Sequence, residues 1–463
     1  MVCSLLNSCA SKIISNYQMT KEAVVSIPQE LIQILLAVAI RDGQTPATKV
    51  LISSWPYQVL NLRTVVKIMN FSLRSIKHDI VITILNVVVG VEGCKVKFVD
   101  LQGFELNCLQ MQNCLQAMIN GFKPDSQCKR VIFDWSVDAD NYSIVSKAMK
   151  KFSEGSQVEL LCGKLSAEGL SENKLIKLIK YLKNDVAQGL NLSLNHLKNE
   201  GLIKVLPHLD RLSNLRCLDL SYNVFNLTLS NGDSLCKCFK EVFTSLRKLQ
   251  DISLNYNRIT GRMLDIISPL KTPVRLLKLD SCYLNAGDLS FLGNTMDISN
   301  LEVLDLSGNA LSSYIQSLEN LLLRSGNSLI KLTLAGTSLG DHEHSLTMLT
   351  RVAKGFKKLK FFSVQFNNFG REEQVPLVCA FASIKSMNEM KITEIRDEMG
   401  IDESDEAYNL ALRIGGVPRD LSKYKDALDR AGCCDMFDLE IKDEEHGDLF
   451  VDPSDYGINY ANL

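Results

Sequence analysis

The residues of this sequence whose types and spacing could do chemistry are few. Its six histidines are dispersed except for His342 and His344, which flank Glu343. Two imidazoles and a carboxylate could ligate a metal ion, but a cluster of this kind on a loop is more often solvated, so we expect no metal site. The sequence has no P-loop, zinc-protease or nucleophile-elbow motif. We therefore expect a protein that is not an enzyme and binds no cofactor.

The cysteines also lack a metal-binding pattern. Cys236 and Cys238 are separated by one residue, and Cys433 and Cys434 are adjacent, whereas a zinc site needs two-residue gaps in paired motifs. Both pairs are expected to be structural or incidental. The 14 cysteines are spread through predicted strands and helices rather than gathered in disulfide-rich caps. This distribution favours reduced thiols and a cytoplasmic location, with the nucleus as a second location.

Another kind of chemistry, the burial of apolar side chains against a partner, is indicated near the N-terminus. Leu5, Cys9 and Ile13 recur every four positions, so a helix would align them in one stripe. Such a stripe could bind a partner, or it could pack on the remainder of the chain.

A second short motif follows. Pro28 suits the first turn of a helix because its missing N–H donor costs nothing there, and Ser26 is a candidate cap before it. Leu31 and Leu35 would then lie on the same helix face.

The elements that must position these residues are repeats. Seven segments in residues 187–369 follow the pattern L-x-x-L-x-L-x-x-N-x-L, and the clearest begin at Leu215, Leu249 and Leu301. Successive copies start 25 to 34 residues apart, close to the length of a strand plus a full helix. Leu218 and its equivalents are expected to point inward from short parallel strands, while Asn223 and its equivalents bond to backbone groups at the turn.

The sequence therefore predicts an α/β fold, a leucine-rich-repeat solenoid, or horseshoe, with a parallel concave sheet and outer helices. Fainter copies at residues 96–106, 131–133 and 160–162 place its start near residue 95. We predict a helical N-terminal region over residues 1–94, a solenoid over 95–390 and an acidic C-terminal region over 391–463. The N-terminal region is expected to act as a cap, because repeat units bury their faces only against neighbours.

The small net charge of −2 hides an asymmetry along the chain. Residues 391–463 carry 19 acidic and 8 basic side chains, a net charge of −11, against +9 for residues 1–390. The acidic region could be partly ordered and fold back over the repeats, where it could inhibit binding, or it could be a solvated segment. No run approaches the roughly 20 apolar residues of a membrane span, and we expect neither a membrane association nor a secretory signal.

The two N-terminal motifs resemble the elongin-C-binding box and the cullin-2 box of substrate receptors for cullin-RING ubiquitin ligases. The first pattern is met by Ser4, Leu5, Cys9 and Ile13, and the second by Ile27, Pro28, Leu31 and Leu35. The cullin-5 variant favours a second proline where this chain has Glu30, so cullin 2 is preferred. Residues 27–62, including Ser54-Trp55-Pro56-Tyr57, and the repeats that follow are similar to the PRAME family (preferentially expressed antigen in melanoma).

The resemblance implies a non-catalytic substrate-recognition subunit of a cullin-2 RING ubiquitin ligase. Leu5, Cys9 and Ile13 would bind elongin C, which is joined to elongin B. Cullin 2 with its RING subunit would be engaged by Ile27, Pro28, Leu31 and Leu35. The alternative that the resemblance implies is a leucine-rich-repeat scaffold that regulates innate immune, NF-κB-type signalling by binding a signalling protein. An enzyme with a novel site is a third alternative, which would require a strongly perturbed ionisable cluster.

A protein substrate or degron would bind the repeat surface. The candidate residues point outward from the strands or follow them directly: Asp219, Tyr222, Ser253, Tyr256, Lys278, Asp305 and Phe366. Their charges are mixed, so this surface is no basic groove and we expect no nucleic-acid partner. The aromatic side chains could anchor a peptide, although tyrosine at this repeat position also serves as turn packing.

Overall fold

The computed structural model describes residues 2–71, 76–104, 106–122, 129–153 and 156–391. The described chain forms two compact units, the first extending to Leu192 and the second beginning at Ser193. Of the predicted acidic C-terminal region, Lys391 alone lies within the described residues.

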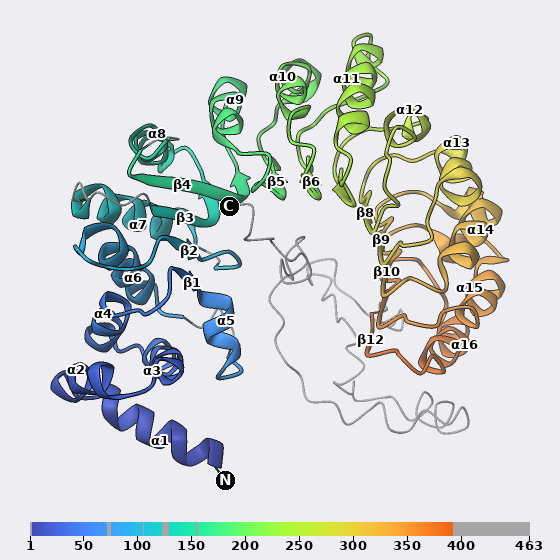
Figure 1. The fold of residues 1–463 in the computed structure, drawn as a ribbon. Helices are drawn as coiled ribbons and strands as arrows, with labels where there is room; N and C mark the ends of the chain where they lie inside the picture. Colours follow the sequence, from blue (N-terminus) through green and yellow to red (C-terminus); the bar gives the residue numbers. More distant parts are fainter. Residues whose placement is uncertain (1, 72–75, 105, 123–128, 154–155, 392–463) are drawn as a thin grey trace, which may run out of the picture. The chain divides into compact units, whose positions relative to one another are not determined.

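The first unit joins a group of helices to a parallel ladder of strands (Figure 1). Its strands pair in chain order, and every pair is parallel. The elements are α1 (Val2–Ile14), α2 (Tyr17–Ser26), α3 (Gln29–Arg41), α4 (Thr45–Ser53), β1 (Val59–Asn61), α5 (Leu62–Lys67), α6 (His78–Gly90), β2 (Phe98–Asp100), α7 (Cys108–Gly121), β3 (Lys129–Val137), α8 (Tyr142–Lys151), β4 (Val158–Ala167), α9 (Glu172–Tyr181) and β5 (Gly189–Asn191).

The ladder begins upstream of residue 95, within the segment expected to be helical. Val59 of β1 pairs with Phe98 of β2, so one strand precedes the first repeat that the sequence indicates. The apolar run at residues 80–91 falls in and just after α6, whose Ile80, Ile84 and Leu85 are buried in the core. No helix within the described part of the chain has the length and apolarity that a bilayer crossing requires.

The second unit contains the clearest repeats, each consisting of a three-residue strand and a helical segment (Figure 1). Consecutive strands from β6 to β12 pair in parallel. The elements are α10 (Lys198–Val205), η2 (Leu206–Leu209), β6 (Cys217–Asp219), α11 (Gly232–Ser245), β7 (Asp251–Ser253), α12 (Met263–Ile267), β8 (Leu276–Lys278), α13 (Ala286–Ser290), η3 (Phe291–Thr295), β9 (Val303–Asp305), η4 (Ser312–Tyr314), α14 (Ile315–Ser325), β10 (Lys331–Thr333), η5 (Leu339–Asp341), α15 (Ser345–Ala353), β11 (Phe361–Ser363), α16 (Arg371–Ala382) and β12 (Glu389–Lys391).

The core of the second unit lies between the strands and the helices. The middle residue of each strand, such as Leu218 in β6, Ile252 in β7 and Leu304 in β9, is fully buried. The first outer helix of this unit is short, because α10 ends at Val205 and the tighter turn η2 follows. Pro207 explains the change, since its ring removes a backbone donor and disfavours a continued α-helix. The predicted α/β leucine-rich-repeat fold is confirmed.

Buried asparagines fix the turns that follow β6, β7, β9 and β11. Asn309 donates from Nδ2 to the carbonyls of Leu279, at 2.8 Å, and Leu306, at 2.9 Å. Its Oδ1 accepts the backbone N–H of Leu284 at 3.1 Å. One side chain thus satisfies backbone groups of two neighbouring repeats, which is the role that the sequence predicts for this position.

Two repeats use other residues at the asparagine position. Thr337 Oγ1 donates to the carbonyl of Leu334 at 2.8 Å, and Cys282 Sγ lies 3.2 Å from the carbonyl of Leu254. Both substitutes keep a bond to the carbonyl of the residue that directly follows a strand. Asn367 and Asn309 of the following repeats then accept the backbone N–H groups of Thr337 and Cys282.

Candidate functional site

The N-terminal helix α1 exposes the predicted apolar stripe. Leu5 is 68% exposed, Cys9 is exposed and Ile13 is half-buried. Large apolar side chains left in water are unfavourable, and a cluster of them marks a surface that another molecule covers. Leu5 and Cys9, with part of Ile13, are therefore accessible to a partner.

The opposite face of α1 holds the helix to the first unit. Ala10 and Ile14 are buried, and Ser11 Oγ donates to Asp42 Oδ2 at 3.1 Å. Arg41 Nε lies 2.7 Å from Asp42 Oδ1, and this contact lowers the pKa of the Asp42 carboxyl. Because a different face anchors the helix, Leu5 and Cys9 are not needed to hold it in place.

The second motif lies where α2 passes into α3. Pro28 is exposed and is the N-cap of α3, while Ile27 is the C-cap of α2. Ser26 does not cap α3 as expected, since it ends α2 and its hydroxyl donates to the carbonyl of Glu22. Pro28 is the N-cap of α3 because its backbone, with φ of −57° and ψ of 144°, is not helical, and α3 begins only after it.

The remaining two residues of this motif differ in exposure. Leu31 is half-buried, but Leu35 is only 4% exposed and packs within the helices of the first unit. Its neighbours Leu36, Val38 and Ile40 are buried as well, so the C-terminal half of α3 is core on all sides. Leu35 therefore supports the helix from inside, and the accessible part of the motif is Ile27, Pro28 and Leu31.

In the second unit, one side of the sheet faces α10–α16 and the other, here called the helix-free face, carries none of these helices (Figure 1). Register aligns the third residue of each strand in one row, on the side opposite the buried middle residues. The row consists of Asp219, Ser253, Lys278, Asp305, Thr333, Ser363 and Lys391. Asp219 and Ser253 are more deeply buried than a surface role suggests.

A second row follows three residues further along each repeat, where the backbone turns. Tyr222, Tyr256 and Phe366 occupy it with φ angles of 56°, 57° and 58°, and all three side chains are exposed. In other repeats Gly308 and Gly336 hold the same position with φ near 60°. The turn thus requires a left-handed conformation that glycine adopts freely, and an aromatic side chain there needs a compensating interaction.

Tyr222 and Tyr256 provide such an interaction. Their rings are stacked with centroids 4.3 Å apart and planes within 15°. Burial raises the pKa of Tyr222 to about 12, and Tyr256, Asp280 and Asp219 add to the increase. The ring pair therefore lies within electrostatic range of two carboxyl groups.

The carboxyl groups near this ring pair are partly desolvated. Burial raises the pKa of Asp219 and of Asp305, and the neighbouring Lys278 partly offsets both increases. Asp280 also raises the pKa of Asp305. Asp280 itself was not among the predicted surface residues, although the register of the repeat that begins at Val274 would have placed it two residues after Lys278 on the same face.

Among the described residues, neither His342 and His344 nor Cys236 and Cys238 form a metal site. The rings of His342 and His344 are 5.6 Å apart, and His344 Nε2 lies 3.3 Å from Glu343 Oε1. Within the described ranges, no three His, Cys, Asp or Glu side chains are grouped closely enough to hold a metal ion. Cys236 is buried in α11, which raises the pKa of its thiol to about 11. Cys433 and Cys434 lie outside the described residues.

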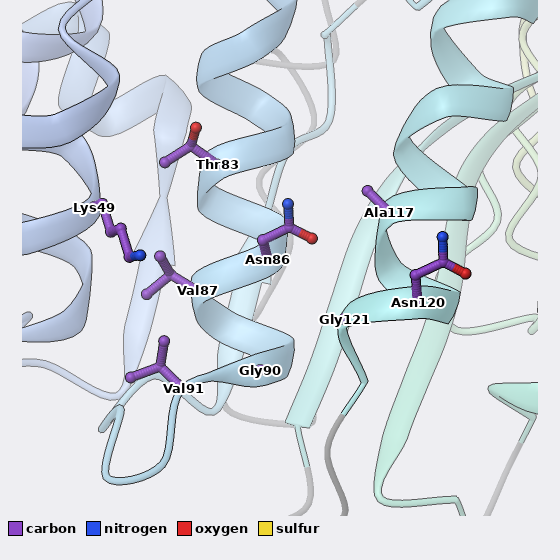
Figure 2. Close-up of a pocket in the computed structure, with 9 residues that line it drawn as sticks. All are labelled: Lys49, Thr83, Asn86, Val87, Gly90, Val91, Ala117, Asn120 and Gly121. Atoms are coloured by element: carbon purple, nitrogen blue, oxygen red, sulfur yellow. The ribbon is translucent and has the colours of Figure 1, made fainter.

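A pocket of about 520 Å³ opens on the helical side of the first unit, between α4, α6 and α7 (Figure 2). Asn86 and Asn120 line it, and Lys49 contributes its charge. The helix ends meet closely here, since a Cβ on Gly90 would lie 2.6 Å from the carbonyl oxygen of Gly121. Lys49 is the one charged side chain among the lining residues, so this pocket lacks the paired groups that a reaction needs.

The family model and the sequence relatives point to the same family. The model of the PRAME C-terminal domain matches residues 140–379, more than half of the chain. Leucine-rich repeat-containing protein 14 of Bos taurus is 24% identical over 374 residues, covering 72% of this chain and 76% of that protein. PRAME family member 20 of Homo sapiens is 24% identical over 329 residues, covering 67% of this chain and 69% of that protein. Among solved structures, the crystal structure of the Rad7 and Elc1 complex in yeast aligns with a TM-score of 0.39 and 12% identity, covering 89% of this chain and 94% of that chain.

Proposed function

The chain belongs to the PRAME family of leucine-rich-repeat proteins, and from this premise we propose that it is a substrate-recognition subunit of a cullin-2 RING ubiquitin ligase. In this role it binds elongin C, with elongin B, through α1 and binds a protein substrate through its repeat surface. It supplies proximity, while the recruited ubiquitin-conjugating enzyme supplies the chemistry. We expect it to act in the cytoplasm, with the nucleus as a second location.

The observation that carries the proposal is the exposed stripe on α1. Leu5 projects into solvent at a position where the elongin-C-binding box requires a leucine, and Cys9 and Ile13 follow at the required spacing. Burying a leucine side chain in an apolar pocket is worth about 1.5–3 kcal/mol. The stripe therefore supports an interface centred on Leu5.

The second motif supports an adjoining contact with cullin 2. Ile27, Pro28 and Leu31 are at least partly accessible where α2 meets α3. Leu35 is not part of the proposed contact, because its side chain is committed to the core. Helices α1 and α3 are joined through Ser11 and Asp42, which keeps the two motifs in one body.

A binding experiment with purified elongin B, elongin C and cullin 2 tests the proposal. Leu5→Ala is expected to weaken the affinity for elongin C by about 2 kcal/mol, roughly 30-fold, because it removes the central buried side chain of the interface. An Ile27→Ala/Pro28→Ala double variant is expected to keep elongin C and lose cullin 2.

Val25→Ala is the matched control, since Val25 is an aliphatic side chain on α2 that is 87% exposed and lies outside both motifs. It should bind like the unchanged chain. If the unchanged chain binds no elongin C, the proposal is wrong, and a scaffold that regulates innate immune signalling by binding a signalling protein becomes the leading function.

A further inference from the structure

We propose that the helix-free face of the second unit binds an arginine-bearing peptide segment, held by the stacked rings of Tyr222 and Tyr256 and by the carboxylates of Asp219, Asp280 and Asp305. These five residues are called the aromatic-acidic site. The inference deepens the proposed function by naming the chemistry of the substrate, and it rests on that function only in calling the peptide a substrate.

The two rings form a preorganised platform. They are stacked at 4.3 Å, and their turns are tied to the next repeat by backbone bonds from Tyr222 N to Asn255 O, at 2.9 Å, and from Tyr256 N to Asp280 O, at 2.8 Å. Tyr222 is 39% exposed and Tyr256 is 45% exposed. Because the backbone bonds hold the rings in place, little conformational entropy is lost when a planar ligand group stacks on their exposed faces.

The charges beside the platform select a cation. Asp219 and Asp305 belong to the same strand row as Lys278, and Asp280 follows Lys278 by two residues. Lys278 acts electrostatically on Asp219 and on Asp305, so three carboxyl groups and one ammonium group lie in this part of the face. The three carboxylates outnumber the one ammonium group, so the local potential is negative. A negative potential attracts a positively charged ligand and repels an acidic or phosphorylated one.

Asp219 adds a buried negative charge close enough to act on Tyr222. It is 2% exposed, and its Oδ1 accepts the backbone N–H of Ser221 at 2.8 Å. Its Oδ2 has no hydrogen-bond partner among the residues that the structure describes. Because this carboxyl is buried, it acts on a ligand through its charge rather than through a direct hydrogen bond.

The adjoining repeat shows that a guanidinium is compatible with this surface. The guanidinium carbon of Arg258 lies 5.2 Å from the centroid of the exposed Tyr283 ring. Arginine combines such ring stacking with a fork of N–H donors that fits a carboxylate, whereas lysine offers a compact charge with no planar face. The aromatic-acidic site therefore favours arginine over lysine.

Fluorescence anisotropy with the full chain tests the inference. The probes are a fluorescein-labelled Gly-Ser-Arg-Gly-Arg-Ser-Gly peptide and the same peptide with citrulline in place of both arginines, which keeps the shape and removes the charge. The arginine peptide is expected to bind at least tenfold more tightly at low salt. Tyr256→Ala and Asp280→Asn are each expected to weaken its binding about tenfold.

Two further variants separate a lost contact from a lost fold. Tyr256→Phe keeps the ring and should bind within about twofold of the unchanged chain. Tyr181→Ala removes an exposed tyrosine of α9 in the first unit and should leave binding unchanged. Equal binding of the two peptides, no binding of either, or unchanged binding by both Tyr256→Ala and Asp280→Asn overturns the inference. Elongin C binding is measured separately, so failure of the proposed ligase role and failure of this site are distinguishable.

Discussion

Asp134 in β3 shows how a single side chain can make this protein sensitive to pH. Its Oδ2 accepts the backbone N–H of Gly103 at 2.8 Å, and its Oδ1 has no hydrogen-bond partner among the described residues. Burial raises the pKa of the carboxyl to about 6, against the opposing effects of the Gly103 N–H, Lys164 and Arg63, and Asp100 adds to the increase. The folded state therefore holds this proton more tightly than the unfolded chain does.

The consequence for stability follows from proton linkage. Below the unfolded pKa near 4, both states are protonated and Asp134 contributes nothing. Between about pH 4 and 6 the unfolded chain releases the proton while the folded chain keeps it, so stability falls as the pH rises, and above about 6 the loss is complete. Asp134→Asn should raise the melting temperature more at pH 7.5 than at pH 4.5. An equal shift at the two pH values would contradict this account.

At the scale of the repeat element, the buried asparagine stabilises the turn in every repeat that carries one. Asn309 joins the turns that follow β8 and β9, because its Nδ2 has three carbonyl oxygens within hydrogen-bond distance and its Oδ1 accepts two backbone N–H groups. Its removal leaves backbone donors and acceptors buried without partners, and water cannot replace them without disturbing the turn.

Asn309→Ala is expected to lower the free energy of unfolding by about 2–4 kcal/mol, because several buried polar groups lose their partners at once. Urea denaturation followed by circular dichroism measures the change. Asn294→Ala is the matched control, since Asn294 is exposed in η3, and its effect should stay within about 0.5 kcal/mol. Similar losses for the two variants would mean that the asparagine position is not special.

At the scale of the whole molecule, the proposed contacts fall on different units. The elongin and cullin motifs lie in α1–α3 of the first unit, and the aromatic-acidic site lies in β6–β9 of the second. Repeat proteins are stabilised mainly by contacts between neighbouring repeats, so a ligand bound to one unit should protect chiefly that unit.

Hydrogen exchange can measure this division. Elongin B and elongin C together should slow amide exchange in α1–α3 and leave β6–β12 unchanged. The arginine peptide should instead slow exchange at the turns that carry Tyr222 and Tyr256. Protection by elongin that spreads evenly over both units would show that they respond as one body.

The sequence by itself determined the architecture and the places where a partner is expected. A repeat of leucines with a following asparagine is compatible with few folds, because each leucine must be buried and the backbone groups of each turn must be hydrogen-bonded. The strands, their parallel order and the row containing Asp219 and Lys278 could therefore be predicted. The spacing of Leu5, Cys9 and Ile13 likewise places them on one helix face.

Tertiary structure alone decided which of these residues reach solvent. A helical period states that Leu31 and Leu35 share a side but cannot say how deep α3 is embedded, and only packing against its neighbours buries Leu35. In the same way, the stacking of Tyr222 on Tyr256 and the burial of Asp219 depend on distances between residues about 30 positions apart. Burial and charge are set by the sum of such contacts, which local sequence does not contain.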